Sequence, residues 1–179
     1  MSTLCLVPHQ ALARQWRQPL QSNEDLLPFS LTGLVSHLLK EQGVPYRESA
    51  VLEQLSLWES VWNVSDSLEF FAPLSTFPGF IQDLHSLFGR ISAEAVDINQ
   101  FAKQQQQELL LIYNAYYERL RKLQVLDQAT QMRQAIDFWP KSKLYEQVKL
   151  VEQYYLGDLT PLERQFIQQI TAGKQVVHR

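Results

Sequence analysis

The stretch TLCLVP, residues 3–8, is short, apolar and closed by proline, which is typical of a buried β-strand. Apolar residues then recur at helical spacing over residues 11–16, and residues 26–29 form a second short apolar run. A further helical stretch follows and ends at Gly43, because glycine readily adopts the backbone conformation that closes a helix. This β-α-β-α order predicts a parallel sheet.

The middle of the chain, from Pro45 to Lys141, shows helical patterns only. Apolar residues keep a 3.6-residue period over residues 51–62, 80–91 and 109–123, and no strand pattern separates these stretches. We therefore predict that this part of the chain is all α-helical.

The end of the chain returns to the first pattern. Residues 148–156 are rich in β-prone side chains, and Gly157 breaks the run. Thr160 followed by Pro161 is typical of a helix start, with the threonine as N-cap and proline in the first turn. Residues 176–177 are compatible with the start of another strand.

These patterns together predict an α/β fold that carries a large all-α insertion and is predominantly helical overall. Residues 1–45 and 142–179 are expected to form a small parallel sheet flanked by helices. Residues 46–141 are expected to form a separate helical insertion subdomain.

Composition indicates a soluble chain of a reducing compartment. The 179 residues are 45% hydrophobic, enough to bury a core, yet no stretch approaches the roughly 20 apolar residues that cross a bilayer. The amino terminus lacks the residue order of a signal peptide, and the single cysteine, Cys5, is expected to be buried and inert. We therefore expect a cytoplasmic protein without membrane partners.

No residue pattern supports catalysis. The glycine-lysine loop that binds nucleotide phosphates, the Glu-x-Lys pair of restriction-type nucleases and the Gly-x-Ser-x-Gly elbow are all missing. The histidines have no second ligand at a spacing typical of zinc sites; they are His9, His37, His85 and His178. We predict no catalytic residue, no metal site and no cofactor.

Two features of residues 109–123 bear on nucleic-acid binding. Tyr113, Tyr116 and Tyr117 have ring faces on which unpaired bases can stack, but two of them share the leucine face, which favours core packing. The densest basic cluster lies beside them and is a tentative phosphate contact: Arg119, Arg121 and Lys122. The net charge of −3 predicts that any DNA contact is local or shared with other parts.

Several short motifs, taken in order, resemble one protein family. They are LVPHQ at residues 6–10, FSL at 29–31, PGF at 78–80, IYxxYxxxL at 112–120 and LTPLE at 159–163. Together they resemble the amino-terminal half of the B subunit of AddAB-type ATP-dependent helicase-nucleases, which are related to the RecB family of exonuclease-like proteins. The resemblance covers almost the whole chain and rests on the order of the motifs, since none is specific alone.

The resemblance implies a degenerate superfamily 1 helicase-like lobe with a helical insertion. The family's nucleotide-binding strand and loop, expected before Thr3, are missing, which suggests an excised fragment or a shortened amino terminus. Tyr154 and Tyr155 stand where active helicases carry the Asp-Glu pair that holds magnesium, and Asp158 is better interpreted as a turn residue. ATP hydrolysis by this chain is therefore not expected.

The resemblance also implies a path for DNA, because His9, Gln10, Ser30 and Thr32 match positions that face DNA in related motors. A purely structural interpretation competes with this one. Ser30 or Thr32 can cap the helix that follows, and His9 can mark the start of another.

Two functions remain open at this point. The first is a non-catalytic scaffold that binds single-stranded DNA within a helicase-nuclease for double-strand-break repair and recombination, beside a partner subunit or the remainder of its parent chain. In that case the exonuclease lies downstream of this chain. The second is a helical module that docks a partner protein and contacts no DNA. The resemblance favours the first, and the absence of a net positive charge favours the second.

Overall fold

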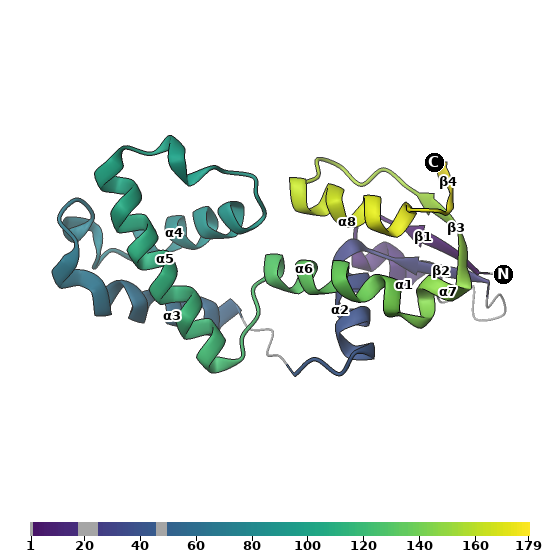
Figure 1. The fold of residues 1–179 in the computed structure, drawn as a ribbon, viewed down its shortest axis with the longest axis horizontal. Helices are drawn as coiled ribbons and strands as arrows, with labels where there is room; N and C mark the ends of the chain where they lie inside the picture. The colour runs from purple at the N-terminus through teal and green to yellow at the C-terminus, as the bar shows by residue number, and fades with distance from the viewer. Residues whose placement is uncertain (1, 18–24, 46–49) are drawn as a thin grey trace. The chain divides into compact units, whose positions relative to one another are not determined.

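The computed structural model describes residues 2–17, 25–45 and 50–179 and divides into two compact units. The first unit comprises Met1–Val44 and Thr130–Arg179, and the second comprises Pro45–Ala129. We call them the α/β unit and the helical unit, and Figure 1 shows the elements of each.

The α/β unit is built on a four-stranded parallel sheet, as the sequence predicts (Figure 1). The strands lie in the order β2-β1-β3-β4; they are β1 (Ser2–Leu6), β2 (Leu26–Phe29), β3 (Val148–Gln153) and β4 (Gln175–His178). In the central strand β1, the side chains of Leu4 and Leu6 are fully buried. Pro28 lies in the edge strand β2, where its missing N–H removes no bond from the sheet interior.

Helices complete this unit: α1 (Gln10–Arg17), α2 (Leu31–Glu41), α6 (Gln128–Phe138), α7 (Lys143–Gln147) and α8 (Pro161–Thr171). The predicted start of α8 is confirmed, because the Thr160 hydroxyl accepts the backbone N–H of Glu163 while the Glu163 carboxylate accepts that of Thr160. Gly43 follows α2 at φ +65°, a left-handed conformation that explains why the helix ends there. A backbone N–H of α7, that of Lys143, donates to the Glu41 carboxylate at the end of α2.

The helical unit consists of α3 (Ala50–Val64), α4 (Pro78–Ser92) and α5 (Lys103–Leu123), with 3-10 turns at Ser65–Ser67, Ala72–Leu74 and Ile98–Gln100. Its core is a single cluster of buried side chains that all belong to this unit: Leu57, Val61, Leu68, Ile81, Leu84, Phe88, Leu109, Ile112, Tyr116, Leu120 and Val125. None of the described helices of either unit is long and apolar enough to cross a membrane.

The division between the units differs from the one drawn on the sequence. The sequence patterns end the helical insertion at residue 141, whereas the structure ends the helical unit at Ala129 and groups α6 with the sheet. Met132, Ala135 and Trp139 are buried in and just after α6. A helical period shows that a helix has an apolar face, but it does not show which core that face joins.

Candidate anion-binding groove

The carboxyl ends of β1 and β2 position the candidate site. β1 runs into α1 through residues 7–9, and β2 runs directly into α2 through Ser30. Ligands of open parallel sheets bind outside the carboxyl ends of the strands, because helix N-termini and loop side chains converge there. The loops after these two strands are therefore the place in the α/β unit to search for a binding site.

A groove of about 190 Å³ lies between α1 and α2; it extends from the first turns of the two helices, at Gln10 and Ser30, to their last turns, at Arg17 and Lys40. One face of each helix lines it, as the three- and four-residue spacing of the side chains shows. The lining residues are Gln10, Ala13, Arg14 and Arg17 of α1, Phe29 of β2, Ser30, and Gly33, Ser36, His37 and Lys40 of α2. Three permanent cations and a histidine thus face the groove, and no carboxylate is among these lining residues.

Arg17 is held against the edge strand β2. Its Nε and Nη2 donate to the carbonyl oxygen of Pro28 at 3.1 and 2.9 Å, and its guanidinium lies 4.3 Å from the centre of the Phe29 ring. The neighbouring carbonyl of Phe29 accepts the N–H of Val7, so the Pro28 carbonyl points to the open side of the edge strand. Burial, and then the nearby positive charge of Arg14, lower the pKa of the Arg17 guanidinium.

Arg14 and Lys40 are the two further cations of the groove. Both side chains are solvent-exposed, and no ion pair found among the described residues engages either one. Their ammonium and guanidinium groups are therefore available to an incoming anion.

Ser30 has a structural role at the groove, since its hydroxyl accepts the N–H of Gly33 at 3.1 Å and caps α2. The Thr32 hydroxyl lies 3.2 Å from the Ser30 hydroxyl and stays exposed. The sequence alone did not decide which of these two residues caps α2, and the structure shows that Ser30 does. A Cβ atom added at Gly33 would lie 3.0 Å from the Ser30 hydroxyl oxygen, so glycine lets the helix approach its own cap.

The residues predicted to face DNA fall into two groups. Gln10 and Ser30 line the groove, whereas the exposed His9 and Thr32 are not among its lining residues. His9 uses its Nδ1 to accept the N–H of Leu12 at the start of α1. His9 and Ser30 therefore both form the local helix-start bonds that the structural interpretation expected. Of the predicted residues that line the groove, Gln10 forms no helix-cap bond of this kind in the described part of the chain.

The cations that dominate the groove were missed by sequence reasoning. Arg14 and Arg17 are one turn apart on α1, and His37 and Lys40 are one turn apart on α2. Each pair alone looks like an ordinary solvated helix face. Only the parallel pairing of β1 with β2 brings the two faces together, and the predicted β-α-β-α order contained that signal.

The basic cluster on α5 belongs to the helical unit and not to the groove. Arg119 forms an ion pair with Glu59, and Lys122 pairs with Glu118 one turn earlier, so two of the three cations are neutralised locally. Arg121 is exposed in the last turn of the same helix. Tyr116 is buried in the core, which confirms core packing for this ring and removes it from base stacking.

The two tyrosines after β3 differ in their surroundings. The Tyr154 N–H donates to the carbonyl of Leu6, its ring packs edge-on against Trp16 at 4.8 Å, and its hydroxyl donates to Glu152. Tyr155 is 82% exposed. Asp158 lies in a bend after Gly157, whose φ is +75°, which fits the turn predicted there.

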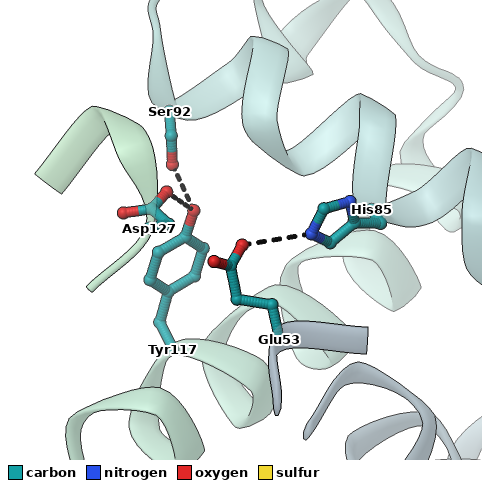
Figure 2. A network of polar contacts seen from close by, with 5 residues as sticks. All are labelled: Glu53, His85, Ser92, Tyr117 and Asp127. Atoms are coloured by element: carbon teal, nitrogen blue, oxygen red, sulfur yellow. Dashed lines mark hydrogen bonds and ion pairs between the residues drawn. The ribbon is translucent and has the colours of Figure 1, made fainter. Parts of the chain in front are cut away.

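A polar network in the helical unit is the second arrangement that we considered (Figure 2). The Tyr117 hydroxyl donates to Asp127 at 2.7 Å and shares a hydrogen bond with the Ser92 hydroxyl, while His85 Nε2 lies 3.2 Å from a Glu53 carboxylate oxygen. Ser92 and Asp127 are only 2% and 6% exposed, so no substrate reaches them. Burial and the charge of Asp127 raise the pKa of Tyr117, so its hydroxyl stays protonated and holds α4, α5 and residue 127 together.

Cys5 is buried, as predicted, and burial followed by the charge of Glu152 raises the pKa of its thiol to about 11. The thiol is therefore protonated and unreactive at neutral pH. Among the described residues, no three histidines, cysteines or carboxylates are grouped as a metal site would need.

Compared with models of known protein families and with curated proteins, the chain gives no match.

Proposed function

We propose that this chain is a non-catalytic, helicase-like scaffold of a DNA-repair helicase-nuclease subunit, and that its groove between α1 and α2 binds the backbone of single-stranded DNA. The observation that carries this proposal is the convergence of Arg14, Arg17 and Lys40 on one groove between α1 and α2, beside the edge strand β2 of a parallel sheet. Phosphate contacts of this kind position a nucleic acid without reading its sequence.

The size of the groove favours a polymer over a small ligand. Its volume of about 190 Å³ is below the roughly 300–1,000 Å³ of typical small-molecule sites. Such a space suits one or two backbone phosphates of a longer strand. The α/β unit has ten basic and eight acidic residues, a net charge of +2, so the DNA contact is local to a chain that is negative overall.

Binding of a labelled thymidine oligonucleotide by fluorescence anisotropy tests the proposal. We expect salt-sensitive binding by the full chain, and about five- to tenfold weaker binding by the double variant Arg14→Ala/Lys40→Ala. The slope of log K against log salt concentration should become shallower by about 1.4 in the variant, since each phosphate contact on single strands contributes about 0.7.

A matched control removes the same charges elsewhere in the α/β unit. Lys141→Ala/Arg164→Ala replaces one exposed lysine and one exposed arginine outside the groove. Equal losses in the two double variants would mean that binding follows net charge and not the groove. Absence of binding at low salt would remove the DNA-binding proposal altogether.

A further inference from the structure

The helix α3 is apolar on two faces, and only one of them is used inside the helical unit. Leu57 and Val61 point into the core and are almost fully buried. The opposite face carries four large apolar side chains in water, which we call the outer stripe: Val51 at 66% exposure, Leu55 at 56%, Trp58 at 37% and Trp62 at 67%. A helix that is apolar all round normally has a partner on both faces.

The spacing of the outer stripe identifies the kind of partner that fits it. Its members are four, three and four residues apart, which is the spacing of the seam between two packed helices. The seam extends over about 16 Å along the helix axis, at about 1.5 Å per residue. An α-helix of about three turns presents the complementary row of side chains.

Charge identifies the chemistry of that helix. α3 has no lysine or arginine, and its last turn has no basic residue against the negative end of the helix dipole. Its two glutamates are paired inside the unit, Glu53 with His85 and Glu59 with Arg119, so the charge of the whole unit is what a partner meets. The helical unit as a whole has six basic and eleven acidic residues, a net charge of −5. Both DNA and a second copy of this unit would meet like charge here, whereas a basic helix would meet opposite charge.

We propose that the outer stripe of α3 docks a basic amphipathic helix of a partner protein. The two tryptophans are the expected anchors, because tryptophan dominates the binding energy of many protein interfaces. The stripe shares no residue with the groove between α1 and α2, so this inference does not rest on the proposed function.

The test uses the full chain and a defined probe. The probe is a fluorescein-labelled synthetic helix of leucine and lysine with leucines at the 4-3-4 spacing. Two further peptides serve as controls, one with glutamate in place of lysine and one with the lysine-leucine sequence scrambled. We expect saturable binding of the first peptide, and binding at least about tenfold weaker for both controls.

Variants of the protein locate the binding surface. Leu55→Ser/Trp62→Ser should weaken binding of the probe at least about tenfold while leaving the melting temperature nearly unchanged, because both side chains are exposed. The matched control Leu110→Ser/Leu111→Ser removes two exposed apolar side chains of α5 and should bind like the unchanged chain. Equal binding of the scrambled peptide, or equal losses in both double variants, would overturn the proposal.

Two other outcomes would assign the stripe to a different occupant and also overturn the proposal. One is self-association in sedimentation that Leu55→Ser/Trp62→Ser abolishes, which would mean that a second copy covers the stripe. The other is binding of single-stranded DNA that the same variant abolishes, which would make the tryptophans a base-stacking surface. Arg14→Ala/Lys40→Ala should retain binding of the basic helix, so failure of the DNA proposal and failure of this one are distinguishable.

Discussion

Glu108 shows how one carboxylate organises a turn of the helical unit. It lies on α5 and accepts backbone N–H groups from Glu69, Phe70 and Phe71 at 3.0, 2.8 and 2.9 Å. Burial alone would raise the pKa of the Glu108 carboxyl, but these three hydrogen bonds outweigh it and hold that pKa below its usual value. The ionised form is therefore part of the folded structure.

We expect Glu108→Gln to reduce the free energy of unfolding by about 1–3 kcal/mol at neutral pH, since an amide oxygen accepts these bonds less strongly. The folded pKa is depressed, so this stabilisation is present above the unfolded pKa of 4.5 and is lost as the pH falls through the folded value. Urea denaturation of both proteins should show the difference at pH 7 and a smaller one near pH 3. A comparable loss in Glu118→Gln, whose carboxylate pairs only with the exposed Lys122, would contradict the assignment.

The His85–Glu53 pair predicts the opposite pH dependence. The hydrogen bond to Glu53 raises the pKa of His85 above 6.5, against the lowering effect of burial. The stabilisation is thus complete below the unfolded pKa and is lost as the pH rises through the folded pKa. A double-mutant cycle with His85→Gln and Glu53→Gln should give a coupling energy of about 0.5 kcal/mol at pH 5.5 and less at pH 8.5, because the pair is partly exposed. Equal coupling at both pH values would show that the histidine charge has no part in it.

Among the helices, α2 depends on Ser30 for its first turn. The hydroxyl of Ser30 caps the Gly33 N–H, and an alanine there leaves that donor without its partner. We expect Ser30→Ala to lower the free energy of unfolding by about 1 kcal/mol, and Ser30→Gly by only a few tenths. Thermal melts of both variants beside Ser36→Ala test this order. A glycine variant that is less stable than the alanine variant would mean that Ser30 acts through packing and not as a cap.

The sequence predicts elements well where the signals are local. The helix that starts at Thr160 and the helix that ends at Gly43 each follow from a few neighbouring residues, and the parallel sheet follows from the order of short elements along the chain; the structure confirms all three. Features that depend on which elements meet were not predicted. One is the unit to which α6 belongs, and another is the groove that Arg14 shares with Lys40. Both depend on tertiary contacts, and the helical period of a sequence contains no information about those contacts.

For the whole molecule, the two units differ in charge and in the continuity of their chain. The α/β unit is positive and is formed from two separate segments, whereas the helical unit is negative and is one continuous segment. Among the residues that the structure describes, its buried cluster draws on none outside Pro45–Ala129. A continuous segment with a complete core has what a chain needs to fold by itself.

We therefore expect residues 45–129, expressed alone, to give a helical far-UV spectrum and a cooperative thermal transition. Ile112→Ala provides the decisive comparison, because this side chain is fully buried and its truncation should lower the free energy of unfolding by about 2–5 kcal/mol. The same loss in the isolated segment and in the helical transition of the full chain would show that the core is autonomous. A broad, non-cooperative melt of the isolated segment would show instead that the helical unit depends on the α/β unit, because isolated helices of this length are marginal without tertiary packing.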